Sequence, residues 1–70
     1  DKTLTQWSNE IEKSPDDPEL YLHRGELHAM RDERTNAIDD FTEALKLKPN
    51  YLQALASRSF EYMIIAQYDK

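Results

Sequence analysis

The chain repeats its own apolar pattern at a spacing of 34 residues. Two sets of large apolar residues, each followed by a proline, carry the repeat: Leu4, Trp7, Ile11 and Pro15, then Ile38, Phe41, Leu45 and Pro49. A looser match relates another pair of sets: Leu20, Leu22, Arg24 and Glu26, then Ala54, Ala56, Arg58 and Phe60. A fixed period of this size is typical of a unit that cannot bury its apolar face alone and stacks on a copy of itself. It favours a binding or scaffolding role over catalysis.

Length and charge narrow the function further. A chain of 70 residues forms one small domain, which buries only about 60% of the surface that its unfolded form exposes. The net charge of −5 comes from 14 acidic and 9 basic residues. A nucleic-acid partner requires a clustered basic face, so we expect none.

The composition also bears on compartment and context. The sequence has no cysteine, which excludes disulfides and thiolate zinc sites and fits a reducing compartment. No apolar run approaches the roughly 20 residues that span a bilayer, so we expect no membrane insertion and a cytoplasmic location. The chain starts at Asp1 and stops at Lys70 within an apolar pattern. We therefore expect it to be a piece of a longer array.

The apolar periodicity predicts four helices and no strand. They cover residues 4–13, 18 to about 30 or 31, about 36–47, and about 51 to beyond 67. Pro15 ends the first, because proline lacks an amide hydrogen and disfavours helix in the residue before it. Asp17 is the expected N-cap of the second helix, with Pro18 at its first position. Residues 31–34 form a turn, and Thr35 is the expected N-cap of the third helix.

The last helix has a wider apolar surface than one stripe, which predicts burial on more than one side. We expect the core to contain seven large residues: Trp7, Tyr21, Leu27, Ile38, Phe41, Leu45 and Leu55.

The period and its marker residues resemble the tetratricopeptide repeat, whose pattern reads Trp-x2-Leu-Gly-x2-Tyr, then Ala-x3-Phe, then Pro. The full copy here reads Tyr21-x2-Arg24-Gly25-x2-His28, then Ala37-x3-Phe41, then Pro49. The resemblance implies an all-α fold of antiparallel helix-turn-helix repeats, a fragment of a right-handed α-solenoid. It covers residues 1–70 as one domain. Residues 1–15 match the second helix of a preceding repeat, 16–49 a full repeat, and 50–70 the first helix of a following repeat.

Several residues depart from the family pattern. Arg24 replaces an apolar residue, His28 a tyrosine and Asp32 the turn glycine, and Ser59 stands at the position equivalent to Gly25. These departures weaken packing. Arg24 and Arg58 occupy the same position in successive repeats. We expect both stems to pack while their guanidinium groups reach solvent or an acidic neighbour.

The sequence shows no constellation for chemistry. His23 and His28 are five residues apart and lie about 140° from each other around a helix, whereas a two-histidine metal site needs i, i+4 spacing. The adjacent carboxylates at 16–17 and 39–40 point about 100° apart, so neither pair forms a catalytic dyad. The single glycine excludes a glycine-rich phosphate loop. We expect no enzymatic activity, no cofactor and no metal.

The resemblance also implies a groove. The first helix of each tetratricopeptide repeat lines a concave surface that usually takes an extended peptide. Carried over by position, the lining is Glu19, Leu22, Glu26, Ala29 and Met30, with Gln53, Ala56, Phe60, Met63 and Ile64. The alternative is that the apolar members are ordinary core residues.

One subfamily of these domains clamps the C-terminal carboxylate of chaperones with lysine, asparagine and arginine on this face. None of those types occurs at the matched positions, and Glu19 and Glu26 would repel a carboxylate. The sequence thus predicts a protein-interaction module whose groove takes an apolar or basic peptide segment. A structural spacer is the alternative, and an enzyme subdomain whose chemistry lies elsewhere is a third. In the intact array, a groove binder keeps Leu22, Phe60 and Met63 exposed, whereas a spacer buries them.

Self-association is a further expectation. The first helix and the last helix, with Tyr62, Ile65 and Tyr68, are complementary halves of one repeat. We expect the last helix of one chain to dock near the first helix of another, which gives a ring or a filament. The alternatives are a two-fold pairing of two last helices and a monomer that tolerates its exposed ends.

Overall fold

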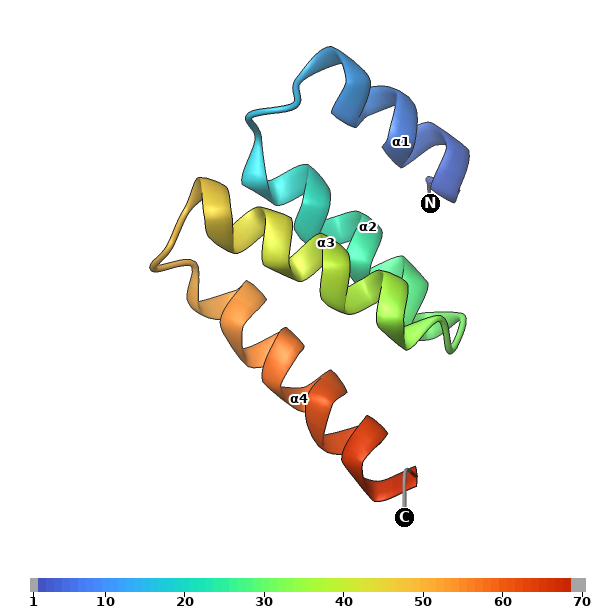
Figure 1. Cartoon of the computed structure of the whole chain (residues 1–70). Coiled ribbons are helices and arrows are strands. Elements are labelled where there is room, and N and C mark those ends of the chain that lie inside the picture. The colour runs from blue at the N-terminus through green and yellow to red at the C-terminus, as the bar shows by residue number, and fades with distance from the viewer. Residues whose placement is uncertain (1, 69–70) are drawn as a thin grey trace.

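The computed structural model describes residues 2–68, and the chain ends discussed above (Asp1 and residues 69–70) lie outside the described part. Four helices and no strand form in residues 2–68: α1 (Leu4–Lys13), α2 (Pro18–Met30), α3 (Arg34–Leu47) and α4 (Leu52–Tyr68). The all-α prediction is therefore confirmed. Consecutive helices run antiparallel, with α1 at one end of the row and α4 at the other (Figure 1). The resulting body is a slab of 40 × 26 × 15 Å.

Side-chain caps fix the starts of the first two helices. At α1, the Thr3 amide donates to Gln6 Oε1 at 2.7 Å, and the Gln6 amide donates to Thr3 Oγ1 at 3.2 Å. This reciprocal capping box satisfies two amides that the helix itself leaves unpaired. At α2, Asp17 is the N-cap, as predicted, and its Oδ1 accepts from the Glu19 amide at 3.1 Å.

The start of α3 differs from the prediction. Glu33 rather than Thr35 is the N-cap, and its side chain makes no capping hydrogen bond. Asp32 has a φ of 63°, in the left-handed region where the family pattern described above has glycine. Aspartate tolerates this conformation better than most residues. The chain therefore turns tightly at Asp32, and α3 begins at Arg34, before the threonine.

The core lies mainly between α2 and α3, with α4 closing one side. Its buried apolar cluster contains Leu22, Ala37, Phe41, Ala44, Tyr51 and Ala54. Phe41 is buried as predicted, and Tyr21 and Leu45 pack at the edge of the cluster. The other predicted core residues Trp7, Leu27 and Ile38 are half-buried. Small residues occupy several fully buried positions, so the helices approach closely and leave little room for large side chains.

Leu55 was predicted to lie in the core, and this is wrong, because 42% of its surface is exposed. The side of α4 that faces α3 carries Ala54 and Glu61, both buried, and Arg58. These positions have the i, i+4, i+7 spacing of one helix face. Because small and polar residues fill this face, the large apolar residues of α4 lie on its other sides.

The 34-residue period is present in the backbone as well as in the side chains. The turns that end α1 and α3 have the same hydrogen bonds. In the first, Ser14 N donates to Glu10 O at 2.9 Å and Asp17 N to Ser14 O at 3.2 Å. In the second, Lys48 N donates to Ala44 O at 2.9 Å and Tyr51 N to Lys48 O at 3.0 Å. The φ angles of Ser14 and Lys48, −137° and −140°, also agree.

Within residues 2–68, no helix combines the length and the apolar character needed to cross a bilayer.

Candidate functional site

A groove of about 530 Å³ lies between α2 and α4. Phe41 of α3 forms its floor. The remaining lining residues come from the two flanking helices: Glu26, Ala29 and Met30 from α2, and Ala56, Ser57, Phe60 and Glu61 from α4. Met30 and Phe60 are large, apolar and exposed. The groove thus has a buried aromatic floor between two exposed apolar side chains.

The antiparallel order of the helices creates this groove. Both α2 and α4 pack on α3, but they touch each other only slightly, so space remains between them. Glu26 and Met30 are four residues apart and lie on one side of α2, as do Ala56 and Phe60 on α4.

The groove brings together four of the eight residues that the sequence singled out as principal candidates: Glu26, Met30, Ala56 and Phe60. Ala29, from the wider predicted lining, joins them. Several other candidates are exposed but lie outside the lining: Glu19, Gln53 and Met63. Ile64 is half-buried and also lies outside it.

Leu22 does not line the groove, which corrects its expected position. Only 3% of its surface is exposed, and it packs in the core cluster with Phe41 and Ala54. Helix α2 turns this residue toward α3 and α4 together, where the small Ala54 leaves space for it. In the described residues Phe60 and Met63 are exposed and Leu22 is buried, and the exposure expected in an intact array stays a prediction.

Three lining residues were not predicted: Phe41, Ser57 and Glu61. All three occupy positions that are equivalent, by the 34-residue repeat, to residues that line another hollow. A second hollow, of about 300 Å³, lies between α1 and α2 and is lined by Lys2, Trp7, His23, Glu26, Leu27 and Met30. Four of these positions, moved along by 34 residues, are Phe41, Ser57, Phe60 and Glu61. The two hollows are therefore equivalent sites of the repeat.

The two carboxylates of the groove differ in their surroundings. Glu61 is buried, and its Oε1 accepts from Arg34 Nη1 at 2.6 Å. This hydrogen bond raises the pKa of Arg34 and compensates the charge of Glu61. Glu26 is exposed, and its Oε1 lies 3.4 Å from His23 Nδ1, a long contact. Glu26 is therefore the negative charge that the groove offers to a ligand.

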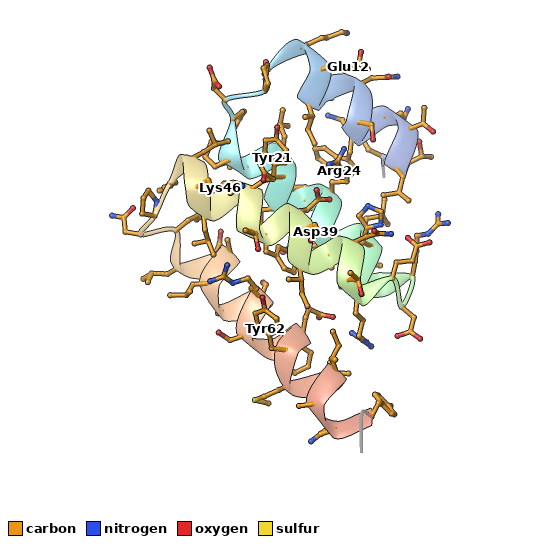
Figure 2. All side chains as sticks on the ribbon, in the orientation of Figure 1. Glu12, Tyr21, Arg24, Asp39, Lys46 and Tyr62 are labelled. Atoms are coloured by element: carbon orange, nitrogen blue, oxygen red, sulfur yellow. The ribbon has the colours of Figure 1, made fainter. Side chains whose placement is uncertain are left out.

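A second ion pair fastens the helices outside the groove. Arg24 Nε and Nη2 donate to the two carboxylate oxygens of Asp40 at 2.8 and 2.7 Å, and Nη1 donates to Ser8 Oγ at 3.2 Å. Figure 2 shows Arg24 between α1 and the neighbouring helices. The bidentate hydrogen bond to buried Asp40 raises the pKa of Arg24. The expectation that Arg24 reaches an acidic neighbour is thus confirmed.

The repeat-equivalent arginine makes an equivalent contact. Arg58 Nη1 donates to Thr42 Oγ1 at 3.3 Å. Thr42 follows Ser8 by 34 residues, as Arg58 follows Arg24, so the arginine–hydroxyl contact recurs in the repeat. Because these contacts join neighbouring helices, we assign both arginines to the architecture rather than to ligand binding.

Both histidines take part in packing contacts. The His23 ring stacks on Trp7 with 5.0 Å between ring centroids. His28 Nδ1 lies 2.8 Å from Glu33 Oε1, and this hydrogen bond lowers the pKa of Glu33. The two rings belong to separate clusters. In the described part of the chain, no group of three or more His, Cys, Asp or Glu side chains is placed to hold a metal.

A larger hollow, of about 680 Å³, lies between the α2–α3 turn and the end of α4. Its lining is Asp32, Arg34, Thr35, Ile65 and Tyr68. Arg34 is held there by Asp32 at 3.0 Å as well as by Glu61. Since its charged groups already satisfy one another, this hollow offers a ligand less than the α2–α4 groove does.

No family model, curated protein or solved structure matches the chain.

Proposed function

We propose that the chain is a tetratricopeptide-like helical repeat module and that its α2–α4 groove binds an extended segment of a partner protein. Support for the repeat comes from the sequence period, the matching turns after α1 and α3, and the recurrent arginine–hydroxyl contacts. The markers Gly25 and Phe41 are in direct contact, as the family pattern implies for its two packed helices.

The observation that carries the proposed binding is the pairing of an apolar groove with one exposed carboxylate. Exposed apolar surface rimmed by polar residues marks interaction sites on soluble proteins. An apolar ligand side chain fits over Phe41, between Met30 and Phe60. A lysine or arginine beside it pairs with Glu26 and strengthens binding, whereas a carboxylate at the same place is repelled.

The size of the groove sets the expected affinity. Its volume of about 530 Å³ is within the range of about 300–1,000 Å³ that ligand pockets occupy. Only one or two ligand side chains fit, and ordering a flexible peptide opposes binding. We therefore expect a micromolar dissociation constant.

Nuclear magnetic resonance titration with synthetic peptides tests this function. The probe is an acetylated peptide of about ten residues that alternates leucine and lysine, and the second arm replaces every lysine with glutamate. The leucine–lysine peptide should perturb the amide signals of Ala29, Met30, Ala56 and Phe60, and the leucine–glutamate peptide should not. Perturbations confined to other parts of the chain, or equal binding of both peptides, would contradict the proposal.

A matched pair of charge reversals separates groove binding from general attraction to an acidic protein. Glu26→Lys changes the charge inside the groove, and Glu19→Lys makes the same change on the same helix outside it. We expect Glu26→Lys to weaken binding of the leucine–lysine peptide about tenfold and Glu19→Lys to weaken it less than about threefold.

A structural spacer remains the second candidate, because Leu22 is buried as that role requires. A spacer binds neither peptide, so the same titration distinguishes the two functions.

A further inference from the structure

The hollow between α1 and α2 (the α1–α2 hollow) continues the α2–α4 groove across α2. Helix α2 contacts both α1 and α4, which do not contact each other in the described residues, so α2 lies between them. Ala29 lines only the groove and Leu27 only the hollow, and they lie about 160° apart around the helix. Glu26 and Met30 fall between them, line both spaces and are exposed. They form a ridge, the Glu26–Met30 ridge, with a binding space on either side.

The α1–α2 hollow is open because of the repeat and not because of where the chain starts. By the 34-residue repeat, Trp7 occupies the position of Phe41, the floor of the α2–α4 groove. In that groove the preceding helix, α2, is present and supplies one wall through Ala29 and Met30, yet about 530 Å³ stays open. A helix placed before α1 in the same register would therefore border the α1–α2 hollow without covering it.

The α1–α2 hollow suits an apolar side chain. Trp7 is half-buried, and its ring stacks on His23 with 5.0 Å between the ring centroids. The cation of the hollow is Lys2, whose Nζ lies 4.5 Å from the centroid of the Trp7 ring. Lys2 also pairs with Glu10, so its charge is already compensated. The exposed carboxylate of Glu26 thus remains the charge that a ligand meets between the two aromatic floors.

We propose that the bound segment crosses the Glu26–Met30 ridge and places a second apolar side chain against Trp7. This inference rests on the proposed peptide binding in the α2–α4 groove. It adds a second contact, in the α1–α2 hollow, and so defines the class of ligand. The ligand carries two apolar side chains, one for each floor, and a basic side chain between them that pairs with Glu26.

The width of α2 sets the spacing of these ligand residues. A helix with its side chains is about 10–12 Å across. An extended chain advances about 3.3 Å per residue, and its side chains alternate between two sides. Apolar residues at i and i+4 therefore point the same way about 13 Å apart, which is enough to span the ridge. The residue at i+2 points the same way midway between them, so this is the basic position over Glu26.

Capped peptides of equal length test the second contact by calorimetry. The two-leucine peptide is Ser-Leu-Ser-Lys-Ser-Leu-Ser, and the one-leucine peptides replace either leucine with serine. The adjacent-leucine peptide, Ser-Ser-Leu-Leu-Lys-Ser-Ser, has the composition of the first but points its leucines to opposite sides. We expect the two-leucine peptide to bind about tenfold more tightly than the others, because it alone buries a second leucine side chain.

Nuclear magnetic resonance locates the second contact. Trp7 is the only tryptophan of the chain, so its indole N–H signal reports on the α1–α2 hollow without a label. The two-leucine peptide should perturb this signal together with the amide signals of Ala29 and Ala56 in the α2–α4 groove. The one-leucine peptides should perturb mainly Ala29 and Ala56, because the α2–α4 groove is the larger of the two spaces.

A matched pair of tryptophan variants tests the second contact from the side of the protein. His23→Trp narrows the α1–α2 hollow, and Gln53→Trp adds the same side chain at an exposed position outside both spaces. In His23→Trp the two-leucine peptide should bind only as tightly as the one-leucine peptides, whose own affinity should stay within about twofold of wild type. Gln53→Trp should preserve the tenfold difference. Circular dichroism checks that both variants remain helical.

The outcomes separate this inference from the function on which it rests. Equal affinities of the two-leucine peptide and either control peptide, or an unchanged Trp7 indole signal, would overturn the second contact. The α2–α4 groove would then stand if Ala29 and Ala56 still responded. Signals of Ala29 and Ala56 that did not respond to any peptide would contradict both the groove and its extension.

Discussion

Gly25 and Phe41 lie so close together that no side chain fits between them: a Cβ atom on Gly25 would be 2.6 Å from Cε1 of Phe41. The carbonyl oxygen of Ala37 would lie 3.2 Å away on the backbone of α3. This contact explains why the only glycine of the chain stands inside a helix. Close approach, rather than backbone freedom, requires it there.

Gly25→Ala should therefore destabilise the fold. In a helix interior, alanine is normally more stabilising than glycine by about 1 kcal/mol. Overpacking a core, however, costs about 1–3 kcal/mol. Because only 1% of Phe41 is exposed and its ring is closely packed, we expect the loss to dominate, with a net decrease of about 1–2 kcal/mol in the free energy of unfolding. Urea denaturation measures it. Ser59→Ala, at the equivalent exposed position of α4, is the control and should be neutral or slightly stabilising. A stabilised Gly25→Ala variant would show that the ring moves freely.

Removing Arg24 should leave a buried charge unpaired. Loss of one partner of a buried ion pair costs about 3–5 kcal/mol, and the partial exposure of Arg24 places this pair lower, at about 2–3 kcal/mol. We expect Arg24→Met to show this loss in a urea titration. Arg24→Met combined with Asp40→Leu should recover most of the stability, because neither charge of this pair is then left in the core. If the loss in free energy of unfolding of the double variant equalled the sum of the losses of the two single variants, the two side chains would be acting independently.

Acid should remove the contribution of Glu33. The His28 hydrogen bond lowers the pKa of this carboxyl in the folded state, from an ordinary value near 4.5. The folded state thus holds this proton less tightly than the unfolded state does. The ionised Glu33 carboxylate therefore stabilises the fold fully above pH 4.5. This stabilisation is lost as the pH falls through the folded-state pKa of Glu33. Wild type and Glu33→Gln should differ in urea midpoint at pH 7 and converge in acid. In a His28→Asn background most of this difference should be absent at every pH, and a difference that grew in acid would reverse the assigned sign.

The sequence predicts the helices of this chain well because strong local signals fix them. Pro15, Asp17 and Pro18 determine where α1 ends and α2 begins, and the structure agrees. The N-cap of α3 was wrong because Thr35 has favourable capping chemistry, but the turn is set by the left-handed Asp32. No local propensity rule for Thr35 includes that constraint.

Burial was predicted less well than helix position, and α4 shows why. Its large apolar residues suggested a core face, but helix–helix approach selects small residues such as Ala54 for the contact and leaves Leu55 exposed. The same effect displaced Leu22 from the expected groove into the core. Four of the eight principal candidates, which were chosen by repeat position alone, line the α2–α4 groove. The floor residue Phe41 was missed there because it comes from α3, outside the two helices that the family resemblance pointed to.

The dissociation constant of the leucine–lysine peptide for two tryptophan variants tests the proposed groove most directly. Ala56→Trp fills the groove, whereas Gln53→Trp adds the same side chain to the same helix at an exposed position outside the lining. Calorimetry should show binding at least about tenfold weaker for Ala56→Trp and within about twofold of wild type for Gln53→Trp. Equal affinities of the two variants would contradict a binding site between α2 and α4.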